Sequence, residues 1–376
     1  MNSKSSHTPR VSVCMVCYNH AAFVGAAISS VLRQTFADFE FLILDNGSRD
    51  RSLDVMRSFD DARISVEALP ENIHSTCAAN RLLTRARGRY VALICSDDAW
   101  LPDKLARQVE WLDAHERCAV AFSRVQVMDA RDRPYRLPTA YDCQFNVRPN
   151  RPAYAWLRLL YGFDNPFCCS SAMLRRSVLQ ECGPYDERSR NVQDLLLWTR
   201  ILFRHEAHIL DGKLVRMRYY PRLTNISAAN AANMVLAANE AQLFYSDFFA
   251  HVTSQEIFNT IFPHAAARHQ AMAERDPQLA LALHTLAQPP TVMAGAWAVH
   301  RLYGLMETAA QRRVYQERYG FDILELYALA QSMDVYGQRR SPLRAACRAA
   351  AKALLRRLHV LMPLKYCQMV LAQKKT

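Results

Sequence analysis

The sequence predicts an α/β protein with a mostly parallel sheet, followed by an α-helical C-terminal region. Short apolar segments alternate with amphipathic helical segments from Val11 to Cys95, a pattern typical of parallel strands joined by right-handed crossovers. From Ala228 onward, glycine becomes sparse and apolar side chains recur at helical spacing. Between these parts, two adjacent acids, Asp97 and Asp98, follow an apolar run. The chain is therefore expected to carry a polar site at one end of a buried sheet.

The elements follow in order along the chain. Val11 to Cys17 is short, apolar and rich in β-branched residues, as expected for a strand that is buried on both faces. Apolar side chains in residues 21–35 have helical spacing and predict the first helix. By the same criteria we predict further strands at 39–44, 64–68 and 90–95, and further helices at 52–59 and 72–86.

Length and composition limit the possibilities. A chain of 376 residues and 43.0 kDa is long enough for two domains. Residues 1–10 are polar and predict a flexible N-terminus without an export signal, and no stretch of 18 apolar residues suggests a membrane span. The 11 cysteines lack the spacing of small disulfide-rich domains. We therefore expect reduced thiols and a cytoplasmic location.

The Asp97–Asp98 pair has two interpretations. Ligands of open α/β sheets bind beyond the carboxyl ends of the strands, where this pair is expected to lie. Two carboxylates there could hold a divalent cation, and the cation could hold a diphosphate. Alternatively, the first Asp could be an ordinary loop residue and the second could cap the N-terminus of the next helix. The surrounding motifs decide between these interpretations.

Glycine-rich phosphate loops are missing from the sequence. No G-x-G-x-x-G follows the first predicted strand, and no G-x-x-x-x-G-K-[ST] occurs in the chain. These absences disfavour a dinucleotide-dependent oxidoreductase and a P-loop NTPase. If phosphates bind at the strand ends, a metal rather than a glycine loop is expected to hold them.

Several motifs in order resemble one enzyme family. They are Val11-Ser12-Val13 with Tyr18-Asn19-His20, residues 30–36, Asp38-Phe39-Glu40 leading to Asp45-Asn46-Gly47-Ser48, Asn80, residues 86–90, and Asp97-Asp98 followed by residues 101–105. In this order and spacing the chain, over residues 10 to 228, resembles a family 2 glycosyltransferase. The resemblance implies a GT-A fold, a nucleotide-sugar donor, a divalent cation and inversion at the anomeric carbon.

The resemblance also implies roles for residues that would bind the nucleoside. Tyr18 matches the family's aromatic residue beside the nucleobase. Asp45 matches the first acid of the family's Asp-Asp-Gly-Ser motif. Asn46 stands where the family usually has the second acid, which accepts a hydrogen bond from uracil. An amide oxygen can also accept that bond, but without charge. We expect a UDP- or dTDP-sugar as donor.

The remaining donor residues would lie near the ribose and the diphosphate. Asn80 belongs to the matching motifs, Asp97 matches the carboxylate at the ribose, and Asp98 matches the metal ligand, with Mg²⁺ or Mn²⁺ expected. Arg218 could contact the diphosphate, or it could be an arginine at a strand edge. Many family members have a histidine at the position of Tyr220, so this chain lacks one possible metal ligand.

The predicted catalytic base is Asp194. The family has an acidic pair, usually Glu-Asp, at the start of a helix that carries a tryptophan; here the pair is Gln193 and Asp194, and Trp198 follows. An acid at a helix N-terminus is also favoured by the helix dipole alone. The resemblance implies that the Asp194 carboxylate accepts the proton of the acceptor hydroxyl.

These motifs divide the chain into a GT-A domain at 11–227, a helical region at 228–338 and a basic amphipathic tail at 339–376. The formal net charge is +12, and no Asp or Glu occurs from Val335 to Thr376. The tail could pack on the body of the protein, or it could lie on an anionic membrane near a lipid-linked acceptor. No nucleic-acid recognition motif accompanies the charge, so we expect no nucleic-acid partner.

The resemblance therefore implies an inverting, metal-dependent glycosyltransferase that acts on a glycan or lipid-linked acceptor in the synthesis of a surface polysaccharide or glycolipid. It is expected in the cytoplasm or on the inner face of the cytoplasmic membrane. Two alternatives remain open. A metal-dependent nucleotidyltransferase would also place acids at strand ends, but it would need a glycine-rich basic loop. A catalytically degenerate transferase that only binds a nucleotide sugar or a partner is kept open by Gln193, Asn46 and Tyr220.

Overall fold

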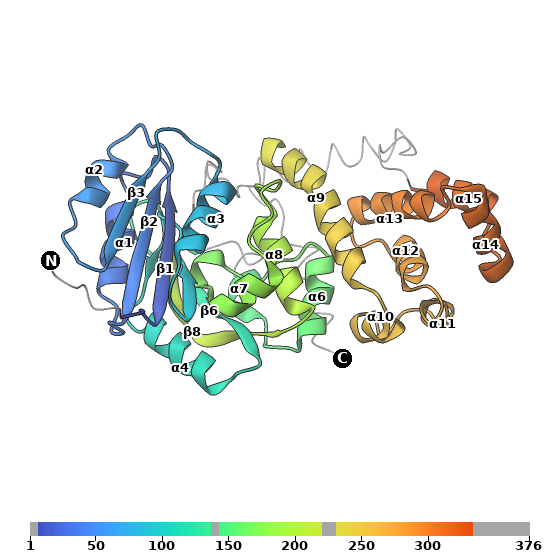
Figure 1. Cartoon of the computed structure of the whole chain (residues 1–376), viewed down its shortest axis with the longest axis horizontal. Helices are drawn as coiled ribbons and strands as arrows, with labels where there is room; N and C mark the ends of the chain where they lie inside the picture. The colour runs from blue at the N-terminus through green and yellow to red at the C-terminus, as the bar shows by residue number, and fades with distance from the viewer. Residues whose placement is uncertain (1–6, 137–142, 220–230, 334–376) are drawn as a thin grey trace. The chain divides into compact units, whose positions relative to one another are not determined.

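The computed structural model describes residues 7–136, 143–219 and 231–333, and Figure 1 shows the arrangement of its elements. Their strands form an eight-stranded sheet in the order β3-β2-β1-β4-β7-β6-β8-β5. The strands are β1 (Val11–Cys17), β2 (Phe39–Asp45), β3 (Ile64–Ala68), β4 (Tyr90–Leu93), β5 (Ala99–Trp100), β6 (Cys118–Met128), β7 (Met173–Arg175) and β8 (Glu206–Arg218).

The first half of the sheet is parallel. β1 pairs in parallel with both β2 and β4, and β2 pairs in parallel with β3. The crossover helices are α1 (Val24–Leu32), α2 (Ser52–Arg57) and α3 (Ser75–Arg85). Figure 1 shows α1 and α2 on one side of these strands and α3 on the other. The direction of winding therefore reverses between β1 and β4, and ligands bind beyond the strand ends at such a switch point.

The second half of the sheet is mixed. β7 pairs antiparallel with β4 and β6, while β6 and β8 are parallel and β5 is antiparallel to β8. β8 is the longest strand of this half and extends from Glu206 to Arg218. The helices of this half are α4 (Lys104–Ala114), α6 (Ala153–Tyr161), α7 (Arg176–Cys182) and α8 (Gln193–Leu202), with short π and 3₁₀ turns at Cys143–Val147 and Cys169–Ser171.

Burial explains the apolar sequence of the central strands. Every residue of β2 is buried, and so are all residues of β1 except Val16. Gly88 lies before β4, where a Cβ atom would come within 2.5 Å of the backbone nitrogen of Ser12. The close approach of these two chain segments therefore requires glycine. The predicted α/β fold with a mostly parallel sheet is confirmed.

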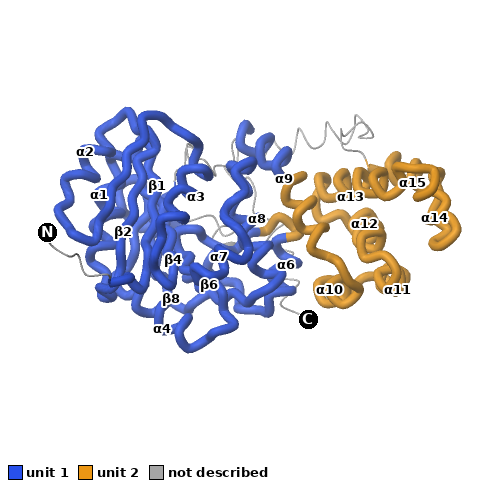
Figure 2. The backbone as a smooth tube through the Cα atoms, in the orientation of Figure 1, with its two compact units in different colours: residues 1–136, 145–160, 165–240 blue, residues 137–144, 161–164, 241–376 orange. Residues whose placement is uncertain are grey.

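The chain divides into two compact units (Figure 2). Unit 1 comprises residues 1–136, 145–160 and 165–240 and contains all eight strands. Unit 2 comprises residues 137–144, 161–164 and 241–376. The predicted boundary at 227/228 and the predicted tail at 339–376 lie outside the described residues.

Unit 2 is helical over its described residues, as predicted for the C-terminal region. Its helices are the second half of α9 (Ala231–His251), then α10 (Gln255–Ile261), α11 (Ala267–Ala273), α12 (Pro277–Ala287), α13 (Val292–Leu305), α14 (Ala309–Tyr319) and α15 (Ile323–Ser332). Five of them begin with a side chain that accepts a hydrogen bond from the first turn: Ser254, Asp276, Thr291, Thr308 and Asp322. Among the described residues, we find no helix with both the length and the apolar character needed to cross a bilayer.

Candidate active site

The two acids after β4 lie in a tight turn at the switch point of the sheet. Asp98 is only 6% exposed. One of its carboxylate oxygens accepts a hydrogen bond of 2.8 Å from the backbone N–H of Arg218, and the other accepts one from the Ser170 hydroxyl. The same hydroxyl accepts a hydrogen bond of 3.0 Å from the backbone N–H of Cys95. Residues from two distant segments thus hold the turn in place.

Arg218 is part of this turn. Its guanidinium donates hydrogen bonds of 2.8 Å to the backbone carbonyls of Asp97 and Asp129 and bonds the carboxylate of Asp132. It also lies 4.5 Å from the centre of the Phe23 ring. Since the side chain is only 1% exposed, Arg218 anchors the acidic turn in this structure. The predicted contact with a diphosphate stays a prediction and would require some of these bonds to be released.

The acids have the electrostatics of a cation site. Burial, and then the charge of Asp97, raise the pKa of Asp98 to about 8. A bound cation would offset both effects. Ligand atoms of Cys95, Asp97 and Asp98 lie within 4.8 Å of one another. Because Mg²⁺ and Mn²⁺ prefer oxygen over sulfur, the two carboxylates fit these ions better than the thiol does.

The residues predicted to bind the nucleoside lie at the carboxyl ends of β1 and β2. Tyr18 is 40% exposed, whereas Asp45 and Asn46 are buried. The Oδ1 atom of Asp45 is buried without a hydrogen-bond partner among the described residues. The amide oxygen of Asn46 already accepts a hydrogen bond of 3.0 Å from the backbone N–H of Ile73. The open acceptor here is therefore Asp45, while the predicted base contact of Asn46 stays a prediction.

Asn80 has a different environment from the other predicted donor residues. Its amide nitrogen donates to the carbonyl of Tyr185 at 2.9 Å and to the carboxylate of Glu187 at 3.0 Å. Its amide oxygen accepts the backbone N–H of Tyr185 at 3.0 Å. All three bonds hold the loop that precedes α8, so Asn80 positions this loop in the structure. A direct contact with the donor, as predicted, would compete with them.

Asp194 lies in the first turn of α8. Its carboxylate accepts hydrogen bonds from the Asn165 amide at 2.9 Å and from the backbone N–H of Leu195 at 2.8 Å. Burial raises the pKa of Asp194 to about 6. A carboxylate with this pKa is ionised at pH 7, and it is a stronger base than an ordinary aspartate.

Electrostatic interactions link Asp194 with the acidic turn. The Tyr185 hydroxyl lies 3.9 Å from the Cys169 thiol, and the charge of Asp194 contributes to raising the pKa of Tyr185, after burial and Cys169. Cys169 is also the largest cause that raises the pKa of the Cys95 thiol, to which the charges of Asp98 and Asp97 add after burial. That the predicted base and the predicted metal ligands form one site stays a prediction, which these interactions favour.

Three residues of this site escaped the sequence analysis. Ser170 bonds Asp98, and Asn165 bonds Asp194. The Nδ1 atom of His20 lies 2.8 Å from the hydroxyl of Ser96, next to Asp97. His20 lies in a motif that we singled out, but Ser170 and Asn165 carry no local signal. Only the fold brings them to the acids.

Comparisons with known proteins identify the family of this chain. The family model "Glycosyl transferase family 2" matches residues 12–183. The Escherichia coli glucosyltransferase WfgD, named for transfer to GlcNAc-diphosphoundecaprenol, is 36% identical over 218 residues, which are 58% of this chain and 79% of WfgD. The putative teichuronic acid biosynthesis glycosyltransferase TuaG of Bacillus subtilis is 38% identical over 122 residues. That alignment covers 32% of this chain and about half of TuaG, 48%.

Solved structures share the fold. Residues 1–349 of Staphylococcus aureus TarS, in complex with UDP, superpose with a TM-score of 0.53 at 15% identity, covering 83% of this chain and 91% of that one. The mannosyltransferase PcManGT from Pyrobaculum calidifontis, in complex with GDP-Man and Mn²⁺, gives a TM-score of 0.51 at 18% identity and covers 89% of both chains. At these identities the likeness establishes the GT-A fold alone.

Proposed function

This chain belongs to the family 2 glycosyltransferases, and from that premise we propose that it transfers a sugar, with inversion, from a nucleoside diphosphate sugar to an acceptor hydroxyl. The observation that carries the proposal is a pair of buried carboxylates with raised pKa values on separate elements, Asp98 after β4 and Asp194 in the first turn of α8. The electrostatic interactions through Cys169 and Tyr185 support the assignment of both to one site.

In the donor part of the site, the nucleobase and ribose would lie over the ends of β1, β2 and β4. Tyr18 offers an exposed ring for stacking, and the unpartnered Oδ1 of Asp45 offers an acceptor for an N–H of the base. Asp97 would accept hydrogen bonds from the ribose. TarS is described in complexes with UDP and UDP-GlcNAc, which supports a uridine donor, with a dTDP-sugar as the related possibility.

The carboxylate of Asp98, beside that of Asp97, would hold Mg²⁺ or Mn²⁺. When bound, such a cation supplies positive charge to the leaving diphosphate. The oxygen ligands and the raised pKa of Asp98 fit this role. The Mn²⁺ described in PcManGT supports it as well. Ser170 and the backbone of Arg218 orient the Asp98 carboxylate, and such supporting contacts tune a metal site.

The chemical step would take place between the two acids. The acceptor oxygen attacks the anomeric carbon and loses its proton to Asp194, while the bond from that carbon to the diphosphate oxygen breaks with its electron pair. One displacement of this kind inverts the anomeric configuration. A retaining double displacement would instead need an enzyme nucleophile close to the anomeric carbon, on the face opposite the leaving diphosphate.

The acceptor is proposed to be a lipid-linked sugar or a growing glycan in surface polysaccharide synthesis. WfgD is named for a diphosphoundecaprenol-linked acceptor, TuaG for teichuronic acid and ExoO of Rhizobium meliloti for succinoglycan. A location on the inner face of the cytoplasmic membrane is part of this proposal, because nucleotide sugars and lipid-linked intermediates would meet there.

A donor screen tests the proposal. The purified chain is incubated with a panel of nucleotide sugars and a bacterial glycolipid extract, and nucleoside diphosphate release and glycosylated products are measured. We expect release with one donor class, dependent on Mn²⁺ or Mg²⁺ and abolished by a chelator. Donor binding without any turnover would favour the degenerate transferase, and pyrophosphate release from nucleoside triphosphates would favour a nucleotidyltransferase.

A further inference from the structure

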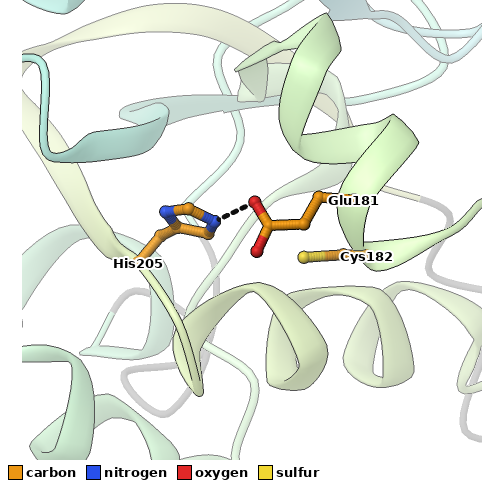
Figure 3. Close-up of side chains that lie close together, drawn as sticks. All are labelled: Glu181, Cys182 and His205. Carbon is orange, nitrogen blue, oxygen red and sulfur yellow. Dashed lines mark hydrogen bonds and ion pairs between the residues drawn. The ribbon is translucent and has the colours of Figure 1, made fainter.

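Unit 1 contains a second cluster of side chains that can bind a metal. It lies at the C-terminal ends of α7 and α8 and consists of Glu181, Cys182 and His205. One ligand atom of each residue lies within 4.8 Å of the others. Figure 3 shows the carboxylate, the thiol and the imidazole directed toward a common space, with the imidazole bonded to the carboxylate. None of these residues takes part in the proposed transfer.

We propose that this cluster binds Zn²⁺. A thiolate, an imidazole nitrogen and a carboxylate oxygen are the ligands that zinc prefers in proteins, and three of them leave the fourth position for water. The ligand set differs from the oxygen ligands of Asp97 and Asp98, so the two sites would select different metals. The cluster is expected to bind Zn²⁺ or Co²⁺ and to ignore Mg²⁺.

The geometry needs little change to accept the ion. The Nε2 atom of His205 already lies 2.9 Å from a carboxylate oxygen of Glu181. The Cys182 thiol makes only a long contact, 3.9 Å, with the backbone carbonyl of Arg200. Ligand atoms on a tetrahedral Zn²⁺ stand roughly 3.3 to 3.6 Å apart. The imidazole–carboxylate pair would therefore have to open slightly, and the thiol would have to move closer to it. Binding would replace the thiol proton by the metal, and the proton is released to solvent.

Solvent exposure and two nearby arginines determine how tightly the cluster can bind a metal ion. The His205 side chain is 26% exposed and that of Glu181 is 45% exposed, so an ion can reach the site from solvent. The Arg204 guanidinium lies 3.3 Å from the Glu181 carboxylate and competes with a cation for it. The Arg200 guanidinium bonds the Cys182 carbonyl at 3.0 Å and adds a second positive charge. Bound metal would connect α7 with the end of α8, whose first turn carries Asp194.

Cobalt titration of the metal-free full-length chain tests this proposal, because a thiolate ligand gives Co²⁺ an intense charge-transfer absorption. We expect this band in the wild type, and we expect Zn²⁺ to remove it and Mg²⁺ to leave it unchanged. The Cys182→Ser variant should lose the band. The Cys95→Ser variant should keep it, and this control separates the cluster from the thiol beside Asp97.

A gain of affinity separates metal binding from a merely structural role. Arg204→Ala removes the competing charge and should tighten Co²⁺ binding roughly two- to fivefold, since exposed ion pairs are weak. Loss of the folded cluster would weaken binding at this site, so a gain of affinity distinguishes the two cases. The proposal is overturned if the wild type gives no thiolate band, if Cys182→Ser retains it, or if Arg204→Ala leaves the affinity unchanged. None of these readouts depends on glycosyl transfer.

Discussion

At the scale of single residues, Asp98 is held by neutral hydrogen-bond donors on both carboxylate oxygens. These donors are the Ser170 hydroxyl and the backbone N–H of Arg218. With its charge buried and Asp97 adjacent, Asp98 is poorly suited to stand alone as an anion. A cation bound to the carboxylate would neutralise this buried charge and would explain the environment of Asp98.

Ser170→Ala tests how far this orientation matters. The substitution leaves one oxygen of Asp98 and the backbone N–H of Cys95 without their partner. We expect metal-dependent donor binding to weaken about tenfold to a hundredfold, the usual effect of losing a residue that orients a metal ligand. Titration calorimetry with UDP and Mn²⁺ measures this. Ser171→Ala is the matched control, because within the described part of the chain the Ser171 hydroxyl bonds only the Cys168 carbonyl, at 2.7 Å. Equal losses in both variants would contradict the role of Ser170.

Asp194 predicts the pH dependence of the reaction. Its pKa is raised to about 6, and only the ionised carboxylate can accept a proton. The rate at saturating donor and acceptor should therefore rise with pH up to about 6 and level above it. This is checked by measuring kcat as a function of pH, with the metal ion saturating at every pH. A profile that is flat from pH 5 to 8 would exclude Asp194 as the group that titrates.

At the scale of elements, the start of α8 depends on α9. The buried carboxylate of Glu240, on α9, accepts hydrogen bonds from the Ser189 hydroxyl and from the backbone N–H groups of Arg190, Asn191 and Val192. These residues directly precede α8, so one acid fixes the entry into the helix that carries Asp194. This contact lies beyond the predicted boundary of the transferase domain.

Glu240→Ala should therefore lower the stability of the fold. It leaves several buried donors unpaired, and each unpaired donor costs about 1–3 kcal/mol. We expect the free energy of unfolding to fall by more than about 3 kcal/mol, measured by urea denaturation. Glu317→Ala is the control: this exposed glutamate forms only an ion pair with Arg313 within α14 and should change stability by less than about 0.5 kcal/mol. Similar values for both variants would refute the account of α8.

The local sequence predicted the limits of strands better than it predicted side-chain contacts. β1 has the predicted limits, because a continuous apolar run determines a buried strand. β3 also has the predicted limits, although it contains Ser65 and Glu67 and is not buried. In contrast, the anchoring roles of the Asn80 and Arg218 side chains arise from partners 105 and 121 residues away in sequence. A polar side chain whose partners lie this far along the chain has no local pattern that reveals them. The family resemblance indicated which acids matter, and the structure adds the residues that orient them.

At the scale of the whole molecule, the tail from residue 339 lies outside the described residues and remains a prediction. Its basic and apolar stripes coincide, and we expect it to bind anionic lipid. The full-length chain should co-sediment with anionic vesicles at low salt, and removal of 339–376 or raised salt should abolish this. Neutral vesicles are the control. If full-length protein ignores anionic vesicles at low salt, the tail has another role.

The central claim is that one carboxylate, Asp194, takes the acceptor proton while the Asp97–Asp98 turn serves the donor. It is tested most directly by kcat of Asp194→Asn beside the dissociation constant of the donor. The new amide nitrogen faces the Asn165 amide, so Asn165→Ala, which removes the same hydrogen bond but keeps the carboxylate, is the matched control. Positioned acid–base catalysis contributes about a hundredfold to ten-thousandfold. We predict that Asp194→Asn lowers kcat by this factor at unchanged donor affinity, while Asn165→Ala keeps most of the activity; weakened donor binding with kcat preserved would contradict the claim.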